Sequence, residues 1–347
     1  MKITRTPSGR TIGDRDELYL IAEVGTTCAG SLDVAIELVQ SAAGAGMDAV
    51  KFQLIDPYQD SDPNATYPVF QNGRLENVNM REMFKKLQFR RDDWSRIAKE
   101  CRDQGVDFLS TVDYLGGVEI LEALDVYAHK IGAWDSTYLP LAREIGETGK
   151  PLYLDLGPTT EKQIEEVVDV YLTAGGSTIL FLHDFHTDIE DEMNFRAITY
   201  LKDKYGWPVG YSSPGLDHDL DFMALGLGAD FIEKRLILDR AEQVFHSHQS
   251  LEPNELRSWV KNIRRVHRAL GTSSISPSRK DIEDSVKYYR SICTSKPVKK
   301  GEVFSMSNIT FKRPGTGLSA VEVDRVLGIS ARRDYLVDEI IFEDDVS

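Results

Sequence analysis

The sequence predicts an α/β fold in which a (β/α)8 barrel is followed by a small β-rich domain. The first observation is that eight short apolar runs alternate with amphipathic stretches over about 250 residues. Continuous apolar strands alternating with helices indicate a parallel sheet that helices cover. The second is that no Gly-rich phosphate-binding fingerprint follows the first run, which disfavours a doubly wound open sheet. We therefore expect a barrel with its site at the C-terminal ends of the strands.

The predicted strands are 18–24, 48–54, 106–111, 128–133, 152–157, 178–183, 208–212 and 229–234. Helical patterns fill the spaces between them, as at 31–46, 90–105 and 160–176. The first of these patterns begins with Ser31 as an N-cap residue and ends at Gly46, as helices commonly do.

Two segments interrupt this alternation. Residues 55–88, rich in Asp, Asn, Pro and Tyr, form a long insertion that is either a lid or an ordered surface excursion. Residues 272–287 have a linker-like composition, and short strands with "KKGE" and "RPGTG" turns follow. We predict a barrel over 1–271, a linker over 272–287 and a small domain over 288–347.

Composition limits the partners. The chain has 347 residues, 41 Lys and Arg, 56 Asp and Glu, and a formal net charge of −15. This charge disfavours nucleic acid as a partner, although a locally basic pocket for a small anionic or sugar substrate is compatible with it. No apolar run approaches the ~20 residues of a membrane span. Three scattered cysteines fit neither a disulfide framework nor a metal knuckle, so we expect a cytoplasmic protein.

Several segments together resemble one enzyme family. "IAEVGTTCAGSLDVAIELVQSAAGAGMDAVKFQ", "HKIGAWD", "VGYSS" and "SLEPNEL" are similar to segments of the sialic acid synthases, the NeuB-like family. "SKPVKKGEVFSMSNITFKRPGTGLSA" resembles the antifreeze-like (SAF) domain that these synthases carry at their C-terminus. The resemblance spans nearly the whole chain and implies a TIM barrel followed by a SAF domain.

The resemblance also implies a reaction. These enzymes join the methylene carbon of phosphoenolpyruvate to the open-chain aldehyde of an N-acetylated hexosamine, and phosphate is released. A divalent metal held by two histidines polarises the aldehyde. The family's usual assembly is a homodimer in which an Arg of the SAF domain reaches the partner's barrel. The Arg at the matching position of this sequence is Arg313, where the alternative is a residue that stabilises its own turn.

Residues at the predicted strand ends match family site positions. Glu23 matches a Glu that handles substrate hydroxyls, and Lys51 and Lys130 match ligands of the donor's anionic groups. A Lys inside an apolar strand is rarely buried without a partner, which also favours an anion-binding role. Gln53 lies two residues beyond Lys51 on the same strand.

Three further residues complete the predicted substrate-binding set. Ser212 and Glu233 match family positions on the last two strands, and Asp135 is expected to contact the acceptor. For Glu23, the alternative is a carboxylate that its neighbouring strands satisfy, and for Ser212 it is a chance match of a common residue.

The departures from the family pattern concern the metal. The two metal-binding histidines are replaced by Pro214 and Arg235. Arg has no lone pair to give a metal, so we expect no metal at these positions and no cofactor. Arg235 would instead stabilise the carbonyl oxygen directly, or it would only pair with a carboxylate such as Asp239. Cys28, in place of another family histidine, is either a nucleophile or a small apolar residue.

The phosphate pocket departs as well. Ala133 lacks the hydroxyl of the family serine, and Asp155 stands where phosphate is expected. A carboxylate facing a phosphate is unfavourable by several kcal/mol at low effective dielectric, on the order of the Coulomb energy of such a pair. The strand-six segment "HDFHTDI" adds His183, Asp184 and His186. A divalent metal relocated to Asp155, His183 and His186 is an alternative to metal-free chemistry.

Three functional hypotheses follow. The first is a carbon–carbon bond-forming synthase that condenses phosphoenolpyruvate or a related 2-oxo-acid donor with a sugar or small aldehyde. Glu23, Lys51 and Arg235 would be its catalytic residues. The second is a lyase, isomerase or hydrolase on the same scaffold. The third is a non-catalytic paralogue that binds a sugar acid or a partner enzyme.

Overall fold

The structure is a computed structural model that describes residues 2–14, 17–71, 74–187, 189–242 and 244–347. It contains two compact units, Met1–Gly271 and Thr272–Ser347. Each unit has its own hydrophobic core, and the two are described separately below.

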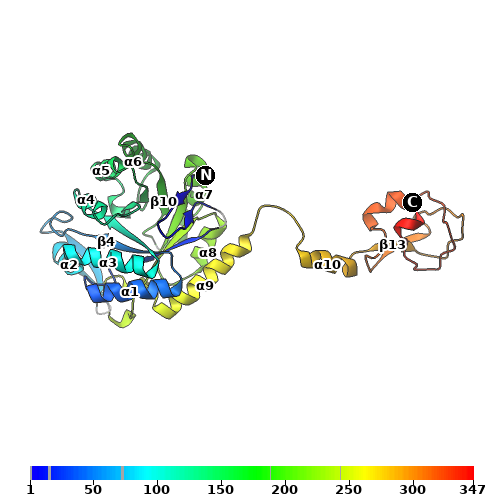
Figure 1. The fold of residues 1–347 in the computed structure, drawn as a ribbon, viewed down its shortest axis with the longest axis horizontal. Helices are drawn as coiled ribbons and strands as arrows, with labels where there is room; N and C mark the ends of the chain where they lie inside the picture. Colours follow the sequence, from blue (N-terminus) through cyan, green and yellow to red (C-terminus); the bar gives the residue numbers. More distant parts are fainter. Residues whose placement is uncertain (1, 15–16, 72–73, 188, 243) are drawn as a thin grey trace. The chain divides into compact units, whose positions relative to one another are not determined.

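Eight parallel strands of the first unit close into a barrel (Figure 1). Neighbouring strands follow the chain order, and the last strand pairs with the first. The strands are β3 (Tyr19–Glu23), β4 (Ala49–Leu54), β7 (Asp107–Val112), β8 (His129–Ile131), β9 (Leu152–Asp155), β10 (Ile179–His183), β11 (Val209–Ser213) and β12 (Phe231–Arg235). All eight correspond to the predicted strands, and the predicted fold class is confirmed.

Helices surround the barrel and connect its strands. They are α1 (Leu32–Ala45), α3 (Arg91–Gln104), α4 (Gly117–Glu122), α5 (Leu139–Glu147), α6 (Glu161–Thr173), α7 (Ala197–Tyr205), α8 (Asp219–Gly226) and α9 (Pro253–Leu270). Ser31 caps α1 by accepting a hydrogen bond from the Val34 N–H, and Gly46 ends this helix at a φ of 90°. Glycine adopts this left-handed conformation without the strain that a Cβ brings.

Side chains of the strands alternate between two environments, because successive residues of a strand point to opposite faces. Outward-facing residues pack against the helices in the larger apolar core. Inward-facing residues such as Ile21, Leu109, Tyr153 and Phe231 fill the lower part of the barrel with a second apolar core. Polar side chains therefore gather above this core, toward the C-terminal ends of the strands.

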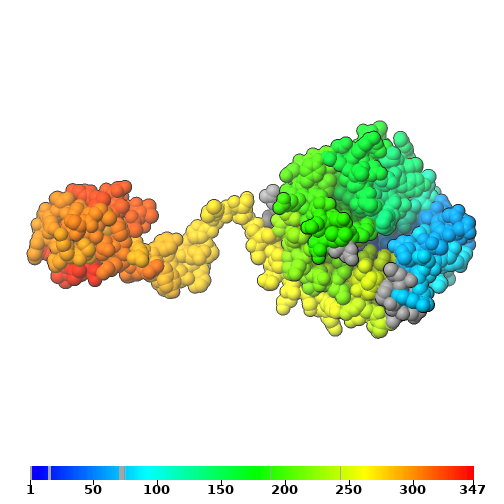
Figure 2. Space-filling view, turned by 180° about the vertical axis from the view of Figure 1, so that it is seen from behind, coloured from blue at the N-terminus to red at the C-terminus, as the bar shows by residue number. Residues whose placement is uncertain are grey.

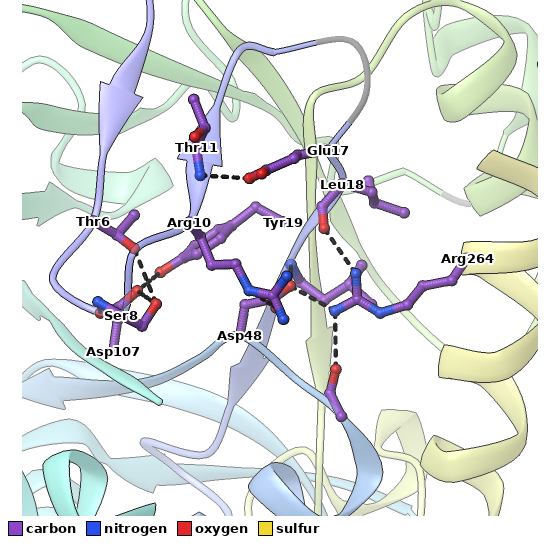
Figure 3. Close-up of polar contacts among 12 residues, drawn as sticks. Thr6, Ser8, Arg10, Thr11, Glu17, Leu18, Tyr19, Asp48, Asp107 and Arg264 are labelled. Atoms are coloured by element: carbon purple, nitrogen blue, oxygen red, sulfur yellow. Dashed lines mark hydrogen bonds and ion pairs between the residues drawn. The ribbon is translucent and has the colours of Figure 1, made fainter. Parts of the chain in front are cut away.

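The N-terminal face of the barrel is closed by the hairpin of β1 (Thr4–Arg5) and β2 (Thr11–Ile12). Asp107, which is 3% exposed, fixes this hairpin (Figure 3). It accepts hydrogen bonds from the Ser8 N–H at 2.8 Å, the Ser8 hydroxyl at 2.7 Å and the Tyr19 hydroxyl at 2.8 Å. Asp48 acts similarly, since it pairs with both Arg10 and Arg264.

The alternation in β12 separates three consecutive charged residues, Glu233, Lys234 and Arg235. Glu233 points into the barrel, whereas Lys234 points outward into the helical layer. There the Lys234 ammonium donates to the Ser213 hydroxyl at 2.7 Å and to Asp221 Oδ2 at 3.1 Å. The Trp259 indole also donates to Asp221 at 2.7 Å. This buried network joins β11, β12, α8 and α9, and it fixes the strand that carries Glu233 and Arg235.

The insertion after β4 contains the antiparallel hairpin of β5 (Thr66–Gln71) and β6 (Arg74–Asn79), followed by α2 (Met80–Leu87). Its residues 72–73 lie outside the described part of the chain. The ring of Tyr67 packs edge-on against Phe245 from the segment after β12, with 5.6 Å between centroids. The light-blue insertion and the yellow-green segment after β12 lie on the barrel face that Figure 2 presents.

The second unit begins with a segment predicted to be a linker, but part of it forms the helix α10 (Arg279–Tyr288). Ser278 and Asp281 form a capping box at its start. This local helix signal was present in the sequence, but the Ser-rich composition favoured the prediction of a linker. Strands β13 (Ser291–Thr294) and β14 (Ile309–Lys312) and the helix α11 (Val323–Val326) follow. Ile292, Val298, Phe304 and Tyr335 are among the buried residues of this unit. In neither unit is any described helix long and apolar enough to cross a membrane.

Replacing Asp107 with Ala should lower the free energy of unfolding by about 2–4 kcal/mol, because three donors lose a buried acceptor. Urea denaturation of Asp107→Ala measures this loss. Asp103→Ala is the matched control, since Asp103 is about half exposed on α3 and its ion-pair partner among the described residues is Lys99. We expect it to change stability by less than about 0.5 kcal/mol. Equal losses in both variants would contradict the role of Asp107.

Candidate active site

A chain of alternating charges lies inside the barrel at the C-terminal ends of its strands. Lys51 forms ion pairs with Glu23 and, at 2.8 Å, with Glu233. Lys130 pairs with the other oxygen of Glu233 at 2.7 Å and lies 3.5 Å from Asp155. All five residues are 5% exposed or less. The structure thus brings together five of the predicted site residues from β3, β4, β8, β9 and β12.

Strand register determines this arrangement. Glu23 is the direct neighbour of Lys51 on β4 and of Arg235 on β12. The backbone N–H of Gly25 donates to Glu23 Oε1 at 2.9 Å, which orients the carboxylate. A Cβ at position 25 would lie 2.8 Å from Gln53 and 3.0 Å from Glu23, so only glycine fits this close approach.

Both predicted anion ligands, Lys51 and Lys130, are therefore paired with carboxylates of the protein itself. Burial alone would raise the pKa of Glu233, but the two lysines lower it to about 2. Burial lowers the pKa of Lys51 to about 8, although Glu233 opposes this shift. Burial also acts against the charge of Lys130, but Glu233 and Asp155 raise its pKa above the usual value. Lys51 therefore loses its proton at a lower pH than Lys130 does.

Asp155 and one further carboxyl group, Asp184, extend the chain toward β10. Burial raises the pKa of Asp155 despite the nearby Lys130. Burial and the charge of Asp155 raise the pKa of Asp184 well above its ordinary value. A carboxyl group whose pKa is raised keeps its proton to a higher pH than an exposed one, and a protonated carboxyl donates a hydrogen bond.

Arg235 is the cation at the upper end of β12. Its Nη1 donates to Gln249 Oε1 at 3.3 Å. Its buried Nε has no hydrogen-bond partner among the described residues. Asp239, the alternative partner predicted from sequence, instead accepts from the Ala241 N–H. Burial, together with the charge of Arg235, lowers the pKa of His246 to about 2, which keeps this imidazole neutral.

An acidic cluster lies at the ends of β4, β7 and β8. Burial raises the pKa of Asp135 to about 6 and that of Asp60 to about 7. Burial and the charges of Asp135 and Asp60 raise the pKa of Asp113 well above its ordinary value. The charge of Lys51 opposes this rise in the pKa of Asp113. The predicted acceptor ligand Asp135 thus has two carboxyl neighbours.

His183 lies outside the chain of charges, although it lines the cavity described below. It is the last residue of β10 and follows the inward-facing Leu182, so it points outward. Its Nε2 lies 2.8 Å from the Met193 carbonyl oxygen, and its ring packs against Phe195. His186 lies nearer the site, because its Nε2 is 3.6 Å from Asp184 Oδ2 and its ring lies against that of Trp134.

The donor set does not fit the predicted metal sites. The outward orientation of His183 prevents it from converging with Asp155 and His186. Among the residues that the structure describes, no group of three or more His, Cys, Asp or Glu side chains is arranged to hold a metal ion. At the family positions, Pro214 and Arg235 offer no metal-binding lone pair in a side chain.

The remaining predicted residues have less defined surroundings. Gln53 and Ser212 are half-buried on β4 and β11, and Ser212 is the register partner of Glu233. Arg313, in the second unit, is exposed and donates from Nε to the Tyr288 carbonyl at 2.6 Å. Cys28 is fully buried, and burial raises its thiol pKa to about 12, which disfavours a nucleophilic role.

A cavity of about 520 Å³ adjoins the site between α6 and α7. Asp184 and His186 line it together with apolar residues such as Leu156, Phe185 and Ile164. Its volume is in the range of small-molecule pockets.

Sequence reasoning left Asp60 and Asp113 out of the predicted site, and it named Asp184 only together with His183 and His186 at the end of strand six. A signal for Asp184 was present, because the alternation of β10 that turns His183 outward turns the next residue inward. Asp113 follows the end of β7 in the same way. Asp60 belongs to the insertion, and no strand periodicity could have placed it.

Comparisons with known proteins agree with this architecture. Residues 38–274 match the model of the NeuB family, and residues 289–347 match the SAF domain. The chain is 34% identical to an uncharacterized protein of Methanocaldococcus jannaschii, over 97% of each chain. It is 30% identical to the N,N'-diacetyllegionaminic acid synthase of Campylobacter jejuni, over 93% of this chain and 98% of that one.

A solved structure shares the fold. The N-acetylneuraminic acid synthetase of Leptospira borgpetersenii superposes with a TM-score of 0.72 at 24% identity, over 82% of this chain and 95% of that one. The family match covers most of the barrel, and the SAF match covers most of the second unit. The chain therefore belongs to the NeuB family and carries a C-terminal SAF domain.

Proposed function

We propose that this protein joins phosphoenolpyruvate or a related 2-oxo-acid donor to the aldehyde of a sugar or small aldehyde, forming an acid of the nonulosonic type. The relatives named as synthases of such acids support the reaction class. The observation that carries the proposal is the buried chain of Glu23, Lys51, Glu233 and Lys130, with Arg235 above it.

Lys130 binds the donor carboxylate in this proposal. An ammonium group has three N–H donors, and Glu233 accepts from one of them. Asp155, at 3.5 Å from the Lys130 ammonium, is beyond ordinary hydrogen-bonding distance. Lys130 therefore has donors left for a ligand without breaking its contact with Glu233.

Arg235 stabilises the negative charge that develops on the acceptor's carbonyl oxygen. Its fixed position on β12, its permanent charge and its unpaired Nε suit this role. The cavity beside Asp184 and His186 offers space for the rest of the acceptor. Glu23 and Asp135 contact its hydroxyl groups, since carboxylates accept hydrogen bonds from hydroxyl donors.

The direct test is to incubate the protein with phosphoenolpyruvate or pyruvate and a panel of aldoses and to search for condensation products by mass spectrometry. With pyruvate we expect a product whose mass equals donor plus acceptor, and with phosphoenolpyruvate one whose mass equals donor plus acceptor plus one water, less the phosphoric acid released. Ligand binding without a product from any pair would contradict the proposal and favour a binding protein.

Replacing Arg235 with Ala should lower kcat/KM about 100-fold or more, as the loss of a single stabilising donor does elsewhere. Arg235→Lys keeps the charge but loses the planar fork, so we expect partial activity. Steady-state kinetics measures both. The control is Arg257→Ala, an exposed residue of α9 that contacts only Asn254 in the described structure. Unchanged kcat/KM in Arg235→Ala would refute the electrophilic role.

Asp135→Asn should have a higher free energy of unfolding than the wild type, and this gain should be larger at pH 7.5 than at pH 4.5. The substitution should also reduce activity. Because the folded-state pKa of Asp135 is raised to about 6, its contribution to stability is present at low pH and lost as the pH rises through this value. Asn does not titrate, so it avoids this loss, worth about 1–2 kcal/mol after allowance for solvent screening. Urea denaturation at both pH values measures the gain, and a pH-independent difference would contradict it.

A further inference from the structure

Trp134 is an exposed aromatic residue at the C-terminal end of the barrel strands. All four tryptophans of the chain lie in its described part, and three of them are 6% exposed or less, whereas Trp134 is 66% exposed. It belongs to the short 3-10 helix η1 (Ala133–Asp135), which follows β8. Single exposed apolar side chains are common on protein surfaces, so exposure alone assigns no role to this residue. Its neighbours carry the argument.

The ring of Trp134 lies against that of His186, which comes from the segment after β10. The two ring centroids are 4.5 Å apart, and the planes are inclined by 39°. His186 also lines the cavity between α6 and α7, and its Nε2 is 3.6 Å from Asp184 Oδ2. Two rings from the ends of different strands thus form one apolar surface, which adjoins both the cavity and the charged site.

The turn that carries Trp134 is fixed by close packing. A Cβ at Gly157 would lie 2.6 Å from the Ala133 Cβ, so the backbone after β9 directly abuts η1. The Ser136 hydroxyl donates to the Ala133 carbonyl at 2.8 Å and lies 2.8 Å from the Thr159 hydroxyl. The backbone of Trp134 is therefore held in place while most of its ring stays exposed. A surface that is ordered before binding loses less conformational entropy when a ligand arrives.

We propose that Trp134 and His186 form a platform on which the acceptor stacks, and that Trp134 thereby selects a sugar over a small aldehyde. This inference rests on the proposed function and names a residue that determines its acceptor. The face of an aromatic ring is electronegative, so it attracts the C–H bonds that line one face of a sugar. A three-carbon aldehyde has too few C–H bonds to cover an indole ring. The carboxyl group of Asp135, the next residue, accepts hydrogen bonds from sugar hydroxyls.

The first experiment is a fluorescence titration of the full-length protein without a donor. The probes are N-acetylmannosamine, N-acetylglucosamine and glyceraldehyde. Because Trp134 is the exposed tryptophan, we expect a bound sugar to shift the emission to shorter wavelength and glyceraldehyde to leave it unchanged. Trp134→Phe removes the indole and keeps a ring, so its emission should no longer respond to the sugar.

The second experiment measures steady-state kinetics with the same acceptors. Trp134→Ala should raise KM for the sugar about tenfold, because one aromatic contact is lost, while kcat and the KM for the donor stay within about twofold. Trp134→Phe should recover most of this loss. The control is Ile3→Ala, which removes an apolar side chain that is 54% exposed beside the hairpin at the opposite end of the barrel. We expect its KM values to equal those of the wild type.

The outcomes separate this inference from the proposed function. An unchanged KM in Trp134→Ala, or glyceraldehyde condensed as efficiently as the sugars, would overturn the platform and retain the condensation. Emission that changes with protein concentration but not with sugar would also overturn the platform, because a second copy of the chain would then cover Trp134. A sugar-dependent shift without a product from any donor would retain the platform and overturn the condensation. Neither shift nor product would overturn both.

Discussion

The ionised carboxylate of Glu233, held between Lys51 and Lys130, is the interaction on which the rest of the site depends. Three charges in a barrel interior are costly unless each is paired, and removing one partner commonly costs about 3–5 kcal/mol. Here each oxygen of Glu233 accepts from a different lysine. Glu233 thereby fixes β4, β8 and β12 relative to one another at their C-terminal ends. The two lysines differ in their second carboxylate neighbour. Lys51 also contacts Glu23, whereas Lys130 lies near Asp155.

Because successive side chains of β12 point to opposite faces, its three neighbouring charged residues have three different roles. Glu233 organises the interior, Lys234 anchors the strand to α8 and α9, and Arg235 presents a cation at the mouth. The same alternation explains why a family histidine can be replaced by Arg235 without disturbing the barrel. The position faces the mouth, where a long polar side chain meets Gln249 rather than the apolar core. The consequence is chemical: a fixed cation stands where relatives of the NeuB type are expected to hold a metal ligand.

The fold was largely predictable from the sequence because strand runs and helix caps are local signals. All eight barrel strands follow from their apolar runs, and Ser31 and Gly46 mark α1 as expected. Residue identity at the strand ends also placed Glu23, Lys51, Lys130, Asp155 and Glu233 together. The sequence did not reveal the ion pairs of the site. Lys51 and Lys130 were expected to bind an anion of the substrate, but each is paired with carboxylates of the protein from other strands. The segment "HDFHTDI" drew attention to His183, Asp184 and His186 together, whereas strand periodicity separates the outward-facing His183 from the inward-facing Asp184.

The central claim is that Arg235 and the paired lysines perform carbonyl chemistry without a metal. Its most direct test is to measure metal content by elemental analysis in untagged protein and to assay the same sample for condensation with and without EDTA. The account predicts a metal-to-protein ratio far below one and a condensation rate that EDTA leaves unchanged. Stoichiometric metal together with activity that EDTA abolishes and added metal restores would contradict it.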